Sequence, residues 1–140
     1  MNQEKRVHLG VYGLIKNGNK ILCIKKTRGP YTGKYDFPGG KLEHGETVLE
    51  GLAREIKEEV NLEIKESKFI ENVAVTLSFV EGNSEIYLLH VGMVYEVIPT
   101  SLEIQQIHAE DVGGSEWIEL ENLNQNNLSP IGYQIVKKYQ

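Results

Sequence analysis

Three glutamates crowd into five residues of the segment REIKEEVN, which covers positions 54–61. On a helix with about 100° per residue, Glu55, Glu58 and Glu59 project from one face, where their charges repel one another. Each like-charge pair destabilises an exposed helix by only about 0.2–0.5 kcal/mol, so crowding alone proves nothing. A hard divalent cation suits such a face, because Mg²⁺ prefers oxygen ligands and shares carboxylates with substrate phosphates. The spacing therefore predicts a metal site.

A glycine-rich loop, residues 28–46, leads into this segment. In it, Gly39 and Gly40 follow a proline, and glycine lets the main chain turn tightly and present carbonyls to a metal or amides to a phosphate. Gly51 lies on the carboxylate face, one turn before Glu55. A glycine inside a helix destabilises it by about 1 kcal/mol relative to alanine, so unless this glycine is incidental we expect another group to approach this face closely.

The spacing of the charged residues resembles the Nudix box, G-x5-E-x7-R-E-U-x-E-E-x-G-U, in which U is a bulky aliphatic residue. The matching positions run from Gly40 through Glu46 and the segment Arg54–Glu59 to Leu62. One fixed position departs, since Asn61 stands where the family usually has glycine. That position needs left-handed backbone geometry, which asparagine tolerates best after glycine. All acidic positions of the box are intact.

The resemblance implies an α/β protein with a Nudix fold, an α/β/α sandwich in which a mixed β-sheet lies between helices. It also implies a metal-dependent pyrophosphohydrolase that cleaves a diphosphate bond in a nucleoside triphosphate or in another nucleoside diphosphate linked to a second moiety. In such a reaction water attacks phosphorus, and Mg²⁺ or Mn²⁺ neutralises the developing charge. One domain is expected over residues 1–140.

The resemblance also suggests a role for each residue of the box. Glu58 and Glu59 are expected to bind the metal, and Glu55 is expected to act as the base or to orient the metal-bound water as a further ligand. Arg54 should hold a box glutamate through a charge-assisted hydrogen bond, and Glu46 should support the site. The carbonyl group of Gly39 or of Gly40 would complete the metal shell.

Residues outside the box are weaker candidates for binding the substrate. Arg28 and Lys41 flank the glycine-rich loop and are either phosphate ligands or plain surface cations. Glu110 or Asp111 would supply a further acidic group, unless both belong to a solvated polar loop. The aromatic residues near the loop are expected in the core more often than against a base: Tyr31, Tyr35 and Phe37. The four histidines show no metal-ligand spacing: His8, His44, His90 and His108.

Two other functions compete with hydrolysis. The chain could be a Nudix-fold module that senses a nucleotide without cleaving it, but a pure sensor would not need Glu55, Glu58 and Glu59 together. A carboxylate-rich Ca²⁺-binding helix is disfavoured, because the segment lacks the alternating oxygen ligands of an EF-hand loop. A solvated amphipathic helix explains the charge but not the combined spacing.

Composition limits the remaining possibilities. A chain of 140 residues with 40% hydrophobic residues suits one globular domain, and a net charge of −5 disfavours a stable nucleic-acid complex. No run of about 18 apolar residues is present, so no membrane insertion is expected. The single Cys23 suits a reduced core thiol, and we expect a cytoplasmic protein that acts on a nucleotide-type small molecule. A homodimer is possible.

The secondary-structure pattern agrees with the expected fold. Two hairpins are predicted, one joining residues 7–16 to 20–27 around Asn17 and Gly18, and one joining residues 69–80 to 85–98. A helix is predicted over residues 47–60, with an apolar stripe made by Val48, Leu49, Leu52, Ala53, Ile56 and Val60. A short strand at residues 117–120 and a helix opening at Ser129 and Pro130 complete the chain.

Overall fold

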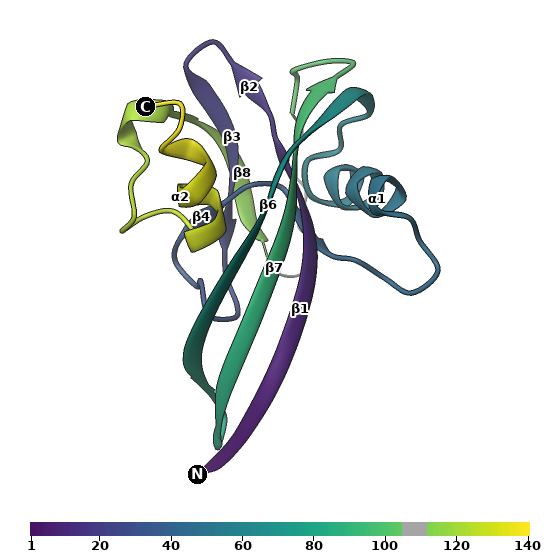
Figure 1. The fold of residues 1–140 in the computed structure, drawn as a ribbon. Coiled ribbons are helices and arrows are strands. Elements are labelled where there is room, and N and C mark those ends of the chain that lie inside the picture. The colour runs from purple at the N-terminus through teal and green to yellow at the C-terminus, as the bar shows by residue number, and fades with distance from the viewer. Residues whose placement is uncertain (105–111) are drawn as a thin grey trace.

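The fold is described by a computed structural model that covers residues 1–104 and 112–140 (Figure 1). Its strands and helices, in chain order, are β1 (Asn2–Leu14), β2 (Lys16–Asn17), β3 (Lys20–Lys26), β4 (Tyr35–Asp36), β5 (Gly39–Lys41), α1 (Val48–Val60), β6 (Ile64–Glu81), β7 (Ser84–Pro99), β8 (Val112–Glu119), a 3₁₀ turn (Leu120–Asn122) and α2 (Pro130–Val136).

The strands form two sheets. In the larger one the order is β5-β1-β7-β6, with β1 parallel to β7 and the other neighbours antiparallel. In the other, β3 pairs with β2, β4 and β8, always antiparallel. The sheet that carries β1 is therefore mixed, as the resemblance implies.

The two helices cover opposite faces of the strands (Figure 1). Alternating residues of β3 point to the two sides: Leu22 and Ile24 join the core under α1, whereas Ile21 and Cys23 join the core under α2. This alternation follows from the two-residue period of a strand that is buried on both faces. The expected α/β/α sandwich is confirmed.

Helix α1 has defined signals at both ends. The Thr47 side chain accepts a hydrogen bond from the Glu50 N–H, and the Glu50 carboxylate accepts one from the Thr47 N–H, which completes a capping box. At the other end Asn61 has φ 54° and ψ 40°, the left-handed geometry expected from the sequence. Leu49 and Ala53, predicted in the apolar stripe, are exposed, since Leu49 lies in the first turn and Ala53 at the edge of the stripe.

The first predicted hairpin is only partly correct. Strand pairing between its two arms covers Lys16 with Ile21 and Asn17 with Lys20, and one further backbone hydrogen bond runs from the Leu22 N–H to the Ile15 carbonyl at 3.0 Å. The chain leaves the strand conformation at Ile15, and upstream of it β1 pairs with β7 and β5. The second hairpin is confirmed, because β6 and β7 pair along almost their whole length. Strand β8 is longer than predicted, and α2 begins at Pro130 with Ser129 as its cap.

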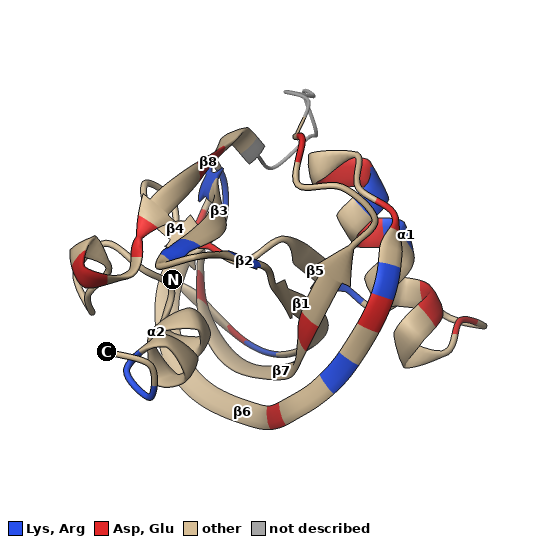
Figure 2. Ribbon diagram, turned by 90° about the horizontal axis from the view of Figure 1, so that it is seen from above, with Lys and Arg blue, Asp and Glu red and all other residues tan. Residues whose placement is uncertain are grey.

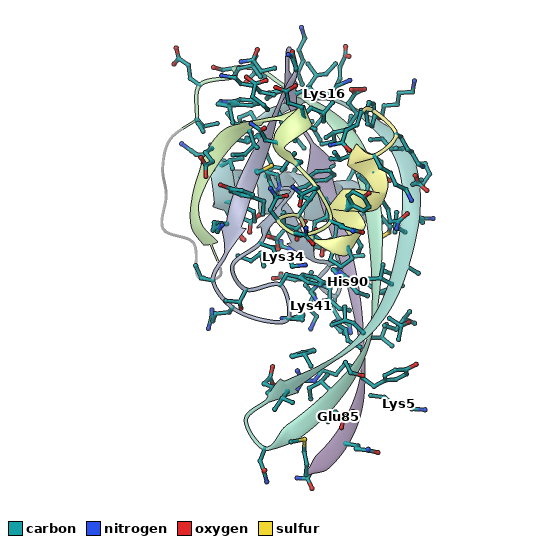
Figure 3. The ribbon with its side chains drawn as sticks, turned by 90° about the vertical axis from the view of Figure 1, so that its left-hand side faces the viewer. Lys5, Lys16, Lys34, Lys41, Glu85 and His90 are labelled. Carbon is teal, nitrogen blue, oxygen red and sulfur yellow. The ribbon has the colours of Figure 1, made fainter. Side chains whose placement is uncertain are left out.

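The distal parts of β1, β6 and β7 form a three-stranded arm that extends away from both helices (Figures 1 and 3). Lys5 and Glu85 lie on this arm, and His90 lies where the arm meets the body (Figure 3). None of the helices in the described ranges is long and apolar enough to span a membrane.

The left-handed end of α1 gives a test of the backbone geometry. An Asn61→Gly protein should equal or exceed the natural chain in its free energy of unfolding, because glycine adopts positive φ without strain. Asn61→Ala should be about 1 kcal/mol less stable than Asn61→Gly, since a Cβ crowds the following carbonyl there. Urea unfolding measures both variants, and equal stabilities would contradict the assigned geometry.

Candidate active site

Arg54 is the centre of a hydrogen-bonded cluster that joins α1 to the preceding loop. It donates from Nε and Nη2 to the two carboxylate oxygens of Glu46, at 3.0 and 2.7 Å. Its Nη1 reaches Glu55 at 2.9 Å and Glu58 at 3.4 Å, and Nη2 also donates to the carbonyl of Lys41 at 3.0 Å. The paired bonds to Glu46 have the fork geometry that only arginine offers. Figure 2 shows the resulting mixture of acidic and basic residues along α1.

The pKa values follow these contacts. Hydrogen bonds from Arg54 and from the Glu43 N–H lower the pKa of Glu46 to about 2, so this carboxylate stays charged. In turn, the hydrogen bonds that Arg54 makes to Glu46, and after it to Glu55, raise the pKa of Arg54 above its ordinary value. Three carboxylates and one guanidinium thus form a cluster that is still net negative.

The two glycines of the loop lie directly against the carboxylates of α1. The Gly39 N–H donates to Oε1 of Glu59 at 2.7 Å. A Cβ added at Gly40 would lie 2.8 Å from the Glu55 carboxylate, closer than real Cβ contacts. A side chain at position 40 would therefore displace the Glu55 carboxylate from its place against the loop.

Gly51 is explained by protein contacts. A Cβ at this position would lie 2.7 Å from Leu42 and 2.9 Å from Oε1 of Glu46. The close approach expected from the sequence is therefore made by the loop that carries Glu46. The glycine lets Glu46 reach Arg54 over the helix surface.

Burial raises the pKa of two carboxylates of α1. The pKa of Glu59, which is 6% exposed, is raised to about 8, first by desolvation and then by the nearby charges of Glu55 and Asp36. Burial also raises the pKa of Glu55, and the charge of Glu58 adds to this effect, while Arg54 opposes it. A bound cation would favour the charged forms, as it does for any cluster of like charges.

The donor set fits a divalent cation, although the side chains do not already form a cage. Within residues 1–104 and 112–140, no group of three or more His, Cys, Asp or Glu stands close enough to hold a metal ion. Glu55 and Glu59 each use Oε1 in the hydrogen bonds above, which leaves Oε2 for another ligand. Glu58 is 55% exposed at its side chain and is held only by a long contact to Arg54. Anionic oxygen ligands of this kind suit Mg²⁺ or Mn²⁺.

A cavity of about 460 Å³ opens beside this cluster. Its lining residues include Arg28, one of the predicted substrate ligands, and Lys26. Lys26 lines the cavity, and its positive charge lowers the pKa of Glu55, Glu59 and His90, in each case less than burial shifts it. The size is within the range of small-molecule sites.

The other predicted substrate ligands are placed less centrally. Lys41 lines a neighbouring hollow of about 260 Å³, and its carbonyl belongs to the Arg54 cluster. Glu110 and Asp111 lie outside the described residues.

Two tyrosines and a histidine form a buried relay at the wall of the cavity. The Tyr12 hydroxyl is hydrogen-bonded to Nε2 of His90 at 2.7 Å, and the Tyr31 hydroxyl to Nδ1 of His90 at 2.7 Å. His8 lies beside His90 with ring centroids 4.6 Å apart, as their pairing between β1 and β7 requires. All four side chains line the cavity.

The family follows from comparison with known proteins. The NUDIX domain profile matches residues 4–139. The chain belongs to the NUDIX family. The ADP-ribose pyrophosphatase of Methanocaldococcus jannaschii is 32% identical over 115 residues, 82% of this chain and 63% of that protein. The 8-oxo-dGTP diphosphatase of Proteus vulgaris is 32% identical over 88 residues, 56% of this chain and 78% of that protein.

The solved structures agree with the fold. A MutT NUDIX hydrolase from Burkholderia pseudomallei superimposes with a TM-score of 0.67 and 20% identity, over 96% of this chain and 99% of that one. The chain spans 63% of the archaeal relative and 41% and 44% of two Nudix hydrolases of Arabidopsis thaliana, less than two thirds in each case.

Of the residues that line the cavity, the sequence predicted a binding role for Arg28 but not for Tyr12, His8 or His90. Tyr12 was given no role, and His8 and His90 were set aside for lack of metal spacing. A signal was present, because both histidines precede a glycine by two residues, in His8-x-Gly10 and His90-x-Gly92. These segments are register partners on parallel strands, so the repeat marks one place in the fold.

The buried His90 gives a testable pH dependence of stability. Burial, with the charges of His8 and Lys26, lowers its pKa to about 3. Between that value and about 6.5 the unfolded chain binds a proton that the folded chain does not, so acid favours unfolding. We expect this residue to remove about 2 kcal/mol of unfolding free energy between pH 7 and pH 5.

Urea unfolding at both pH values measures this effect. Glu59, whose raised pKa acts in the opposite sense, is present in every protein compared, so each variant is measured against the natural chain. Between pH 7 and pH 5 the His90→Gln protein should lose about 2 kcal/mol less unfolding free energy than the natural chain, whereas His44→Gln, at an exposed position, should match the natural chain. An unchanged pH dependence in His90→Gln would show that His90 is not the group responsible.

Proposed function

We propose that this NUDIX protein hydrolyses a diphosphate bond in a nucleoside triphosphate or in another nucleoside diphosphate linked to a second moiety. The observation that carries the proposal is the Arg54 cluster, in which one guanidinium gathers Glu46, Glu55 and Glu58 beside the glycine pair of the loop. Family membership and the names of the relatives support the same reaction.

Each residue of the cluster has a distinct task in this proposal. Glu58 and Glu59, with Oε2 of Glu55 and a carbonyl of Gly39 or Gly40, would hold Mg²⁺ or Mn²⁺. When bound, the cation neutralises charge on the phosphates and lowers the pKa of bound water. Glu55 is either this further ligand or the base; in the second role, the desolvation that raises its pKa makes it a better proton acceptor than an exposed glutamate.

Arg54 acts as a positioning residue. Its bonds to Glu46 and to the Lys41 carbonyl leave Nη1 aimed at Glu55, which fixes this carboxylate against the loop. Lys26 and Arg28, at the cavity, can meet the negative phosphates next to the carboxylates.

The first experiment is a substrate panel. ADP-ribose and 8-oxo-dGTP lead it, because relatives carry names that refer to them, and the common nucleoside triphosphates, nucleotide sugars and dinucleoside polyphosphates follow. Each compound is incubated with Mg²⁺, with Mn²⁺ and with chelator, and the products are separated by chromatography. Metal-dependent cleavage of any member supports hydrolysis, whereas binding of a nucleotide without cleavage of any member would contradict it.

Removing the charge of one carboxylate of α1 should strongly reduce turnover. Glu58→Gln and Glu59→Gln should each lower metal-dependent turnover by at least about 100-fold, since an amide is a poor ligand for a hard cation. Glu63→Gln is the matched control, because Glu63 pairs with Lys57 outside the cluster. Near-normal turnover in Glu58→Gln would exclude Glu58 as a required ligand.

Replacing the arginine separates geometry from charge. Arg54→Lys keeps the positive charge but cannot bind Glu46 through two parallel bonds while reaching Glu55. Turnover should fall about 10- to 100-fold, the usual effect of losing a group that orients a ligand. KM for the nucleotide should change little. An effect on KM alone would indicate that Arg54 contacts the substrate.

A further inference from the structure

The outer edge of the larger sheet is made by β6, the last strand in the order β5-β1-β7-β6 (Figure 2). This strand pairs with β7 on one side, so on its other side alternate N–H and C=O groups point away from the sheet. Within the described part of the chain, no turn, loop or cap hydrogen bond of the backbone reaches residues 72–81. Along the arm, the edge of β6 is therefore open.

The open edge has a sequence that favours pairing with another strand. Residues 73–80 read Val-Ala-Val-Thr-Leu-Ser-Phe-Val, without a charge, a proline or a glycine. Both register shifts between β6 and β7 lie before Glu71, so this stretch is also regular. Charges, prolines and bulges are the features that prevent an exposed edge strand from pairing with a second chain. Residues 73–80 have none of them.

Other edge segments of the same sheet do carry such protection. On the arm the opposite edge is β1, because β5 pairs only with residues 10–12. That edge places Glu4, Lys5 and Arg6 at consecutive exposed positions. The first part of β6, residues 64–71, contains charged residues and both register shifts. The contrast indicates that residues 73–80 are meant to be covered.

The side chains of this stretch are complementary to those of an identical strand. A two-fold axis normal to the sheet at Leu77 would pair two copies of β6 antiparallel and keep each face of the sheet on its own side. On one face Leu77 would meet its own counterpart, and Val75 would meet Phe79 of the second copy. On the other face Thr76 would meet Ser78 of the second copy. Aromatic with β-branched and Thr with Ser are favourable cross-strand pairs.

Charge selects this axis over its neighbour. An axis at Thr76 would place Glu71 directly opposite Glu81 of the second copy, and like charges in that position destabilise a sheet. With the axis at Leu77, Glu81 lies opposite Val73 and the two glutamates are separated. The register at Leu77 is therefore preferred.

Pairing would supply the contacts of a specific interface. Residues 73–81 of two copies would exchange about eight to ten main-chain hydrogen bonds, since every second pair of an antiparallel ladder exchanges two. Specific interfaces carry about ten direct hydrogen bonds. Val75, Leu77 and Phe79 are only half-buried in the single chain, so a second strand would cover them further. An axis of this kind uses the same edge of both copies, so the assembly closes as a dimer.

We propose that two copies of this chain form a dimer in which the edges of β6 pair antiparallel over residues 73–81, around a two-fold axis at Leu77. The two four-stranded sheets then become one continuous sheet, and the bodies lie at opposite ends of the paired arms (Figure 1). Because the paired stretch is short, we expect a dissociation constant of about 1–100 μM. The Arg54 cluster lies on α1 and its loop, so this inference does not depend on the proposed hydrolysis.

Sedimentation velocity of the full chain, from about 1 to 500 μM, tests the dimer. The natural chain should pass from monomer to dimer over this range. Ser78→Lys adds an exposed charge to the open edge and should weaken the dimer at least about tenfold, as edge lysines do. Ser67→Lys is the matched control, because Ser67 is an exposed serine of the same strand outside the open stretch, and it should leave the dimer within about twofold.

Cross-linking tests the axis. In the proposed dimer the two copies of residue 77 face each other at about 5 Å between α-carbons, within the range of a disulfide. The two copies of residue 76 lie about 7–8 Å apart on a diagonal, which is too far. With oxidised glutathione, Leu77→Cys should therefore form a covalent dimer and Thr76→Cys should not. The natural chain is the blank, because its single Cys23 is buried.

Thermal unfolding verifies that each variant is folded, and the natural chain alone already tests whether a dimer exists. A monomer at every concentration, equal effects of Ser78→Lys and Ser67→Lys, or cross-linking of Thr76→Cys in place of Leu77→Cys would overturn the proposal. Turnover of the substrate panel by a chain that stays monomeric would refute the dimer and leave the hydrolase intact. A dimer that cleaves no compound would do the reverse.

Discussion

The bonds between Arg54 and Glu46 hold together the parts on which the site depends. They tie the glycine-rich loop to the middle of α1, eight residues further along the chain. Once the loop is held there, Gly39 meets Glu59 and Gly40 meets Glu55. The arginine also offsets the repulsion among carboxylates on one face, which a helix of this sequence would otherwise bear alone. Its weaker bond to Glu58 leaves the outermost carboxylate free to turn.

At several positions the absence of a side chain on glycine leaves room for a neighbouring residue. Gly40 yields to Glu55, Gly10 yields to Tyr12, and Gly39 yields to the Val11 carbonyl and to Tyr12. Gly39 belongs to both sets, because its N–H binds Glu59 while its α-carbon faces Tyr12 across the pairing of β1 and β5. Gly39 therefore lies between the carboxylates that we propose as metal ligands and the Tyr12-His90-Tyr31 relay, and any shift of β5 would move both together.

Local features were predictable from the sequence. Helix α1, its left-handed end at Asn61 and the start of α2 depend on neighbours within a few residues, so pattern and capping chemistry locate them. The partners of β1 were not predictable in this way. Its parallel pairing with β7 joins segments about 80 residues apart, and only that register brings His8 beside His90. The cavity is a product of this long-range pairing, so spacing along the chain gave only an indirect sign of it.

Charge is distributed unevenly between the α1 carboxylates and the lining of the cavity. The carboxylates of α1 attract cations, the cavity lining holds Lys26 and Arg28 together with Asp36 and Glu81, and the side chains of Tyr12, Tyr31, His8 and His90 in the same lining are neutral. A ligand with phosphates at one end and a flat uncharged group at the other matches this order in one orientation only. Reversed, it would place phosphate against uncharged rings and the base against carboxylates, and both placements would lose solvation without compensation. Under the proposed function, this order of charges would place the phosphates of a nucleotide next to Glu55.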